Sequence, residues 1–265
     1  MSETPDVPAT PRVRGKKPPH SEPVIDRALS LLGVFSDRRR SLTLSDLARH
    51  SGMPISTTLR LADRLVAWGA LERTDDGRYI VGVRLWEVAS LAPRGHGVRE
   101  IALPYLGDLH DVTRQHVLLA VRDGAQAVLI ERLSSRSAPQ VAYRVGGRVP
   151  LRSTAVGLVL LAGAGAAVQE QLLAAPEEIE EGVDQVSAAA LRRTLGEVAR
   201  TGYAVIRRSR PSKTVSVAAP IRDGSGAVVA AVSVLVTDGG ASPHTYTPVV
   251  RATARSISRG LGYAT

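Results

Sequence analysis

A run of hydroxyl and guanidinium side chains begins at residue 56 and continues at helical spacing. Ser56, Thr57 and Thr58 follow one another, Arg60 comes next but one, and Arg64 lies one turn further along. Serine and threonine hydroxyls bind phosphates or base edges, and arginine binds the O6 and N7 atoms of guanine with two hydrogen bonds. At the start of a helix that enters a major groove, this set of side chains predicts contact with double-stranded DNA.

Two further arginines are expected to contact the DNA backbone. Arg64 lies one turn beyond Arg60, where a phosphate is the expected partner, and Arg78 follows a predicted turn from which it could reach the adjacent backbone. The alternative is a helical bundle that binds protein, in which Arg60 is merely solvated. A cluster of hydroxyl side chains beside an arginine favours DNA over that alternative.

Three helices and a hairpin are expected to position these side chains. The expected elements are a helix over 24–36, a helix from a cap at Thr43 or Ser45 to Ser51, a helix over 56–68, and strands over 70–73 and 78–81. The Asp76-Gly77 pair between the two strands is typical of a tight hairpin turn.

Small residues fit the close packing that this arrangement needs. Ala48 allows the third helix to approach the second, and Gly52 permits the turn between them. Leu61 and Trp68 belong to the expected buried stripe of the third helix. The order of the elements predicts a winged helix-turn-helix DNA-binding domain over residues 23–83.

The rest of the chain alternates predicted helices and strands. A linker helix is expected over 84–97, with a hinge at Pro93-Arg94-Gly95, and a second domain over 98–265. The expected helices span about 104–115, 153–164, 166–174, 187–201 and a segment after His244. The expected strands span 116–121, 127–133, 140–145, 203–206, 214–219 and 227–236. This mixture predicts an α+β domain in which helices cover an antiparallel sheet.

Composition excludes several classes of function. The chain of 265 residues has no cysteine, which excludes disulfides, thiolate metal sites and a cysteine nucleophile, and its 3% aromatic content argues against a base-stacking platform. The net charge of +9 is spread over both halves, with 16 cations against 12 anions in residues 1–100 and 18 against 13 beyond, so charge alone does not indicate DNA. Residues 1–22 hold five prolines and neither an apolar period nor a secretory signal. We expect a disordered basic tail and a cytoplasmic protein with no membrane segment.

An enzyme is the competing class of function. His110, His116, Asp108 and Asp111 form the only cluster of histidine and aspartate, and no serine lies in a nucleophile-elbow context. Without cysteine or a paired histidine spacing, metal or nucleophilic catalysis has little support. We therefore expect no catalytic residues, no metal and no cofactor.

Motifs in both predicted domains resemble those of the IclR (isocitrate lyase regulator) family of bacterial transcription regulators. Residues 52–61 (GMPISTTLRL) are similar to the beginning of the family's recognition helix, and residues 76–82 (DGRYIVG) to its wing. Residues 147–157 (GRVPLRSTAVG) resemble the family signature Gly-x-x-Pro-x-x-x-(Thr/Ser)-Ala-x-Gly. Two shorter matches are Gly202-Tyr203-Ala204 and Ala218-Ala219-Pro220.

The resemblance implies a GAF-like effector-binding and oligomerisation domain after the DNA-binding domain. It implies a homodimer or homotetramer that binds a palindromic operator, and a regulator, expected to be a repressor, whose operator affinity changes with a small organic effector. It also implies that the effector pocket is lined by Ser153, Thr154, Ala155, Val156, Ser216 and Ser233. In the sequence, both Ser216 and Ser233 interrupt apolar strands, so a buried hydroxyl there needs a partner.

Three positions depart from the family pattern. Ile55 and Leu158 stand where relatives often carry a cation, and the stretch after Tyr203, commonly acidic in the family, reads Arg207-Arg208-Ser209-Arg210. Guanidinium groups in place of carboxylates favour anions. An anionic effector, an oligomer contact and an exposed loop with no role all remain open. A regulator that binds no ligand and acts through protein contacts of a filled-in second domain is the alternative function.

Overall fold

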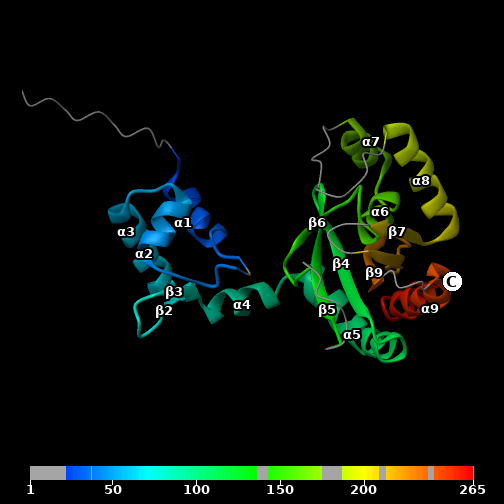
Figure 1. The fold of residues 1–265 in the computed structure, drawn as a ribbon, viewed down its shortest axis with the longest axis horizontal. Helices are drawn as coiled ribbons and strands as arrows, with labels where there is room; N and C mark the ends of the chain where they lie inside the picture. Colours follow the sequence, from blue (N-terminus) through cyan, green and yellow to red (C-terminus); the bar gives the residue numbers. More distant parts are fainter. Residues whose placement is uncertain are drawn as a thin grey trace, which may run out of the picture. The chain divides into compact units, whose positions relative to one another are not determined.

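The computed structural model describes residues 22–36, 38–135, 143–174, 187–208, 213–237 and 242–264. The chain divides into two compact units, Met1–Ser90 and Leu91–Thr265 (Figure 1). Two predictions fall wholly or mostly outside the described residues: the basic tail, and the end of the arginine-rich stretch at residues 209–210. The strand predicted over 140–145 lies half outside them, and its described half, residues 143–145, is not in a strand. No helix in the described ranges combines the length and apolar character needed to cross a membrane.

The first unit contains the helices and the hairpin that the sequence predicts. Its elements are α1 (Val24–Gly33), β1 (Ser41–Leu42), α2 (Leu44–Ser51), α3 (Ile55–Trp68), β2 (Leu71–Arg73), β3 (Tyr79–Val81) and α4 (Val83–Ser90). The three strands form an antiparallel sheet in the order β1-β3-β2. Strand β1 was not predicted, because two residues are too few to show an alternating pattern.

A capping box starts α2, and a left-handed glycine ends it. The Asp46 backbone N–H donates to the Thr43 hydroxyl at 3.1 Å, while the Thr43 backbone N–H donates to the Asp46 carboxylate at 3.2 Å. Thr43 is therefore the cap, and Ser45 is not. Gly52 has a φ of 68°, which only glycine adopts at little cost, and its N–H donates to the carbonyl of Ala48.

The core of the first unit lies between the three helices and the sheet. Leu31, Leu47, Leu61 and Tyr79 pack together there. The predicted burial of Trp68 is wrong: this side chain is 47% exposed, and the Arg84 guanidinium lies over its ring at 5.2 Å. Trp68 is the last residue of α3, so its ring extends past the core and is covered instead by a long charged side chain.

The second unit is a six-stranded antiparallel sheet covered by helices on both faces. Its elements are α5 (Pro93–Thr113), β4 (His116–Asp123), β5 (Gln126–Leu133), β6 (Arg148–Pro150), α6 (Ala155–Ala162), α7 (Ala166–Ala174), α8 (Ala188–Thr201), β7 (Ala204–Arg208), β8 (Thr214–Arg222), β9 (Val228–Thr237) and α9 (Pro243–Gly260). The strand order is β6-β5-β4-β9-β8-β7.

Alternation along the central strand β4 divides the core into two layers. Leu118 and Ala120 pack with residues of α6 and α8, whereas Val117 and Leu119 pack with residues of α5 and α9 (Figure 1). Successive side chains of a strand point to opposite faces, so a strand buried on both faces is apolar throughout. This three-layer arrangement is the expected α+β fold.

Helix α5 differs from the prediction at its start. Residues 93–95 were expected to form a hinge, with the next helix beginning at Pro104, but α5 begins at Pro93 and continues through Pro104. Proline is favoured in the first turn of a helix because its missing N–H has no partner there anyway. The prediction placed Pro93 in a hinge and Pro104 at the start of a helix; both placements are wrong, because one helix runs from Pro93 through Pro104.

Candidate DNA interface and ligand pocket

The outward face of α3 carries most of the side chains predicted to contact DNA. Ser56, Arg60 and Arg64 are exposed, and Thr57 is half-buried. The opposite face of the helix holds Leu61 in the core. Because α3 packs with Leu61 toward the core, its opposite face leaves this row of hydroxyl and guanidinium groups in solvent.

Thr58 does not belong to that row. Its side chain is completely buried, and its hydroxyl donates to the carbonyl oxygen of Pro54 at 3.0 Å. The prediction that Thr58 contacts DNA is therefore wrong. The signal was present in the sequence, because Thr58 precedes Leu61 by three residues and Leu65 by seven, which places it on the buried stripe.

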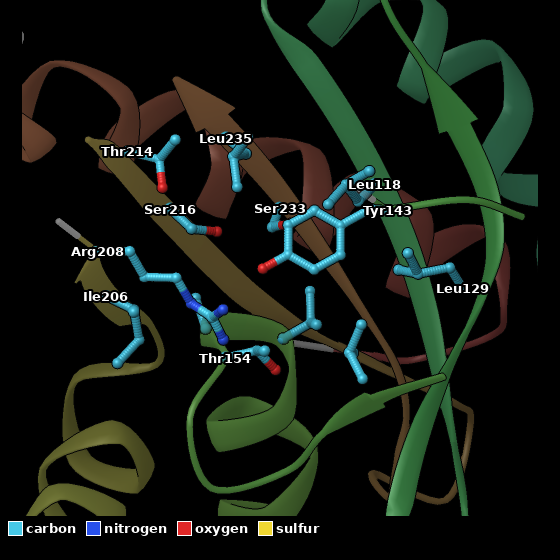
Figure 2. Close-up of a pocket in the computed structure, with 13 residues that line it drawn as sticks. Leu118, Leu129, Tyr143, Thr154, Ile206, Arg208, Thr214, Ser216, Ser233 and Leu235 are labelled. Atoms are coloured by element: carbon cyan, nitrogen blue, oxygen red, sulfur yellow. The ribbon is translucent and has the colours of Figure 1, made fainter. Parts of the chain in front are cut away.

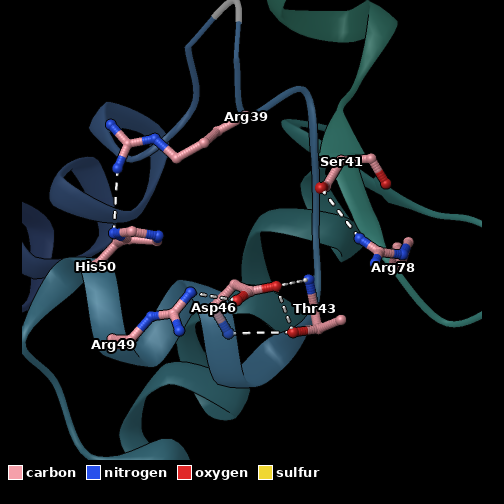
Figure 3. A network of polar contacts seen from close by, with 7 residues as sticks. All are labelled: Arg39, Ser41, Thr43, Asp46, Arg49, His50 and Arg78. Carbon is pink, nitrogen blue, oxygen red and sulfur yellow. Dashed lines mark hydrogen bonds and ion pairs between the residues drawn. The ribbon is translucent and has the colours of Figure 1, made fainter.

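Two contacts hold Arg78, which follows the wing turn. Its Nη1 donates to the carbonyl oxygen of Ser41 in β1 at 3.3 Å (Figure 3). Its Nε lies 3.4 Å from the Asp76 carboxylate. A hydrogen bond from the Thr74 hydroxyl lowers the pKa of Asp76. Asp76 thus partly neutralises Arg78, and Gly77 gives the turn its positive φ of 78°.

Further cationic side chains lie on α2 and in the segment before it. Arg49 pairs with Asp46 at 2.7 Å, and Arg39 Nη1 lies 3.1 Å from His50 Nδ1 (Figure 3). The Arg49 side chain is 70% exposed, so it is available to a phosphate. The sequence reasoning did not single out Arg39 or Arg49, because neither lies on the predicted recognition helix.

A pocket opens in the second unit between the sheet and the start of α6. About 370 Å³ of space lies between its lining residues, including open solvent, but the cavity itself has a volume of only about 20 Å³, room for about one water molecule. Of the six residues that the family resemblance implied, it gathers five: Thr154, Ala155, Val156, Ser216 and Ser233 (Figure 2). Ser153 does not line it. The remaining walls are formed by Leu118, Leu129, Tyr143, Val149, Ile206, Arg208, Thr214 and Leu235.

The cap of α6 forms one wall of the pocket. Thr154 donates its hydroxyl to the Pro150 carbonyl at 2.7 Å and accepts the Gly157 N–H at 3.1 Å. A Cβ on Gly157 would lie 2.6 Å from the Cα of Leu151. The proline, threonine and glycine of this motif therefore fix the turn that brings Ala155 and Val156 to the pocket.

Ser233 places a buried polar group in the wall of the pocket. Its side chain is fully buried on β9, and its hydroxyl makes no hydrogen bond among the described residues. An unpartnered hydroxyl in an apolar wall costs about 1–3 kcal/mol, which a bound ligand could recover. Ser233 thus marks a place where the pocket can accept or donate a hydrogen bond.

Arg208 supplies the guanidinium at the pocket. It is the last residue of β7, and its Nη2 donates to the Ser153 carbonyl oxygen at 3.1 Å. Figure 2 shows it extending from the strand end toward Thr154. Ile206 and Arg208 line the pocket while Arg207 is exposed, because successive residues of a strand point to opposite faces. The sequence drew attention to the arginine-rich stretch but could not say which arginine faces inward.

The histidines and aspartates that could have supported catalysis are separate. His110 Nδ1 contacts the Gln115 carbonyl at 2.9 Å, His116 Nδ1 contacts the Ser134 hydroxyl at 2.8 Å, and Asp111 pairs with Arg114. Across the described segments, no three histidine, aspartate or glutamate side chains are grouped to hold a metal ion. These contacts tie helix and strand ends together.

Family models match both units of the chain. The model described as "Bacterial transcriptional regulator IclR C-terminal" matches residues 92–259, and the "IclR helix-turn-helix domain" matches residues 24–75. Among curated proteins, the regulator XynR of Escherichia coli is 27% identical over 90% of this chain and 97% of its own length. The repressor AllR of the same species is 27% identical over 95% of this chain and 97% of its own.

Solved structures show the same fold. An IclR homologue from Microbacterium hydrocarbonoxydans, in complex with 4-hydroxybenzoate, is 33% identical, with a TM-score of 0.83 and coverage of 90% of this chain and 99% of that one. The Thermotoga maritima IclR is 27% identical, with a TM-score of 0.73 over 90% of this chain and 98% of that one. These relatives are transcription regulators and not enzymes, which agrees with the sequence prediction. The helix-turn-helix, the helix-covered sheet and the family models together show that the chain belongs to the IclR family of bacterial transcription regulators.

Proposed function

We propose that this protein is a repressor whose affinity for a palindromic operator is modulated by a small organic anion bound in the pocket of its second unit. The observation that carries the ligand class is Arg208 at the mouth of an otherwise largely apolar pocket, with the unpartnered hydroxyl of Ser233 in its wall. The repressor assignment is supported by AllR, which is named a repressor.

DNA binding is assigned to α3 and the wing. Ser56, Thr57 and Arg60 are proposed to contact base edges or phosphates at the start of the recognition helix, and Arg64 and Arg78 to contact the backbone. A palindromic operator requires a twofold-symmetric protein, so the proposal includes a homodimer or a homotetramer. Because the proposed partner is chromosomal DNA, the proposed place of action is the cytoplasm.

The walls of the pocket indicate the shape and charge of the ligand. Leu118, Leu129 and Leu235 offer apolar contact to a ring or short chain. Arg208 pairs best with a planar carboxylate, which guanidinium binds with two parallel hydrogen bonds. A small aromatic carboxylate fits both requirements. The Microbacterium homologue bound to 4-hydroxybenzoate, itself an aromatic carboxylate, supports this class.

The alternative is a regulator with a filled-in second domain, prompted by Leu158 and the arginine-rich loop. The small cavity volume of about 20 Å³ favours it. Leu158 does not, because it is buried in the core and is not among the residues lining the pocket.

Calorimetry with the full-length protein tests the ligand class. We expect 4-hydroxybenzoate or benzoate to bind, and the neutral methyl ester of 4-hydroxybenzoate to bind at least tenfold more weakly, because the ester offers Arg208 no charge. Arg208→Gln should remove this preference. Arg207→Gln is the matched control, since that side chain lies on the same strand and points away from the pocket. Equal binding of acid and ester, or no binding of either, would overturn the proposal.

A further inference from the structure

We propose that Ile55 and Leu59 on α3 recognise the C5-methyl groups of thymines in the operator. This inference rests on the proposed binding of DNA by α3 and assigns to two apolar residues a part in sequence specificity. Ile55 stands where relatives often carry a cation. The inference gives Ile55 a role in reading the base sequence, in addition to the loss of a positive charge.

Both side chains are exposed on the outward face of α3. Ile55 is 56% exposed and Leu59 is 39% exposed, and neither belongs to the core of the first unit. Residues four apart on a helix are neighbours, so the two side chains form one short apolar strip. Thr58 and Leu61, both buried, fix the rotation of α3 that turns this strip to solvent.

A polar row runs directly beside the apolar strip. Ser56 and Arg60 follow Ile55 and Leu59 by one residue each, and both are exposed. Isolated exposed apolar side chains are common and need no explanation. An apolar strip beside a hydroxyl and a guanidinium, in the first two turns of a recognition helix, is a different case, because those turns are the ones that face base edges.

The major groove offers one apolar group among its donors and acceptors. That group is the C5-methyl of thymine, which aliphatic side chains contact. An arginine beside an aliphatic pair therefore complements a guanine next to A·T base pairs. A protein partner is a poorer fit for this strip, because Arg60 beside it would have to lose water on binding.

Uracil substitution tests the inference. The full-length protein first selects an operator from a random duplex library. Each thymine of the half-site is then replaced by uracil, which pairs in the same way but lacks the methyl group. We expect at least one position where wild type loses about fourfold in affinity, the value of one buried methyl. Leu59→Ala and Ile55→Ala should each bind the thymine duplex more weakly than wild type. At the thymine whose methyl group the replaced side chain contacted, exchange for uracil should cause no further loss of affinity in that variant.

The ratio of thymine to uracil affinity separates contact from folding, because a general defect weakens both duplexes alike. Ile25→Ala is the matched control: this residue is 71% exposed on α1 and should keep the full uracil effect. An operator with no uracil-sensitive position, or a loss that persists in both α3 variants, would overturn this inference alone. Failure to select any sequence would overturn the proposed DNA binding, and the inference with it.

Discussion

The Arg208 guanidinium donates a hydrogen bond to the carbonyl oxygen of Ser153 at 3.1 Å and so joins the end of β7 to the loop before α6. The two residues are 55 positions apart in the chain. Their contact holds Arg208 at the mouth of the pocket, beside the cap of α6. A carboxylate bound there would share the guanidinium with Ser153, so ligand binding and the position of this loop are expected to be coupled.

Ser233→Ala should separate the stability of the protein from its ligand affinity. Removing a buried hydroxyl that has no partner among the described residues is expected to leave the free energy of unfolding of the unliganded protein unchanged or to raise it by about 1 kcal/mol. Ligand affinity should fall, because the hydrogen bond to the ligand is lost. Urea unfolding and calorimetry measure the two effects. A less stable unliganded variant would show that Ser233 already has a partner in solution.

Gly157→Ala should destabilise the second unit by about 1–3 kcal/mol or more. Its Cβ would lie 2.6 Å from both the Leu151 Cα and the Thr154 Oγ1, so the cap of α6 would have to move. The control is Gly196→Ala on α8, where the new methyl meets nothing within 4 Å. That change should stabilise the helix by up to about 1 kcal/mol. Thermal melts of both variants test this contrast. Equal shifts in melting temperature would contradict the prediction.

Thr58→Val and Arg60→Ala should have opposite effects on folding and DNA binding. Thr58 is buried and hydrogen-bonded to Pro54, so the valine variant should lose about 1 kcal/mol of stability and keep its operator affinity. Arg60→Ala should keep its stability and lose about 1–3 kcal/mol of operator affinity. Fluorescence anisotropy with the selected operator measures the second effect. Normal binding by the Arg60 variant would remove Arg60 from the interface.

Asp46 should contribute stability that disappears in acid. Hydrogen bonds from the Thr43 hydroxyl, at 2.7 Å, and from its backbone N–H lower the pKa of Asp46. A carboxyl with a lowered pKa in the folded state stabilises the protein above its ordinary pKa of about 4, and this contribution is lost as the pH falls through the folded-state value. The stability difference between wild type and Asp46→Asn should therefore be larger at about pH 6 than at about pH 3. Asp75→Asn, in the exposed wing turn, is the control, and a difference independent of pH would contradict the role of the cap.

The sequence predicted the order of elements better than their ends. The Gly52 turn and the Asp76-Gly77 hairpin follow from local chemistry, which a sequence displays directly, whereas the α2 cap was narrowed only to Thr43 or Ser45. Trp68 and Pro104 were misjudged, because the depth of the core and the tolerance of a helix for proline depend on the packing around them.

In the candidate sites, too, local sequence marks some residues and only the fold reveals the others. Strand alternation could have placed Ile206 and Arg208 on one face and Arg207 on the other, but only the fold tells which face meets the pocket. Thr214 enters the pocket from a segment far from the signature motif, and Tyr143 from just before it; nothing in their local sequence marks either residue. Thr58 could have been excluded from the interface by its helical spacing alone.

The most direct test of ligand-controlled DNA binding is the operator affinity of the full-length protein, measured by fluorescence anisotropy with and without saturating 4-hydroxybenzoate. We predict that the ligand weakens operator binding by about 5- to 150-fold in wild type and in Arg207→Gln, and leaves Arg208→Gln unchanged. Operator affinity that stays constant while the ligand is bound, or an equal response in the Arg208 variant, would contradict the account.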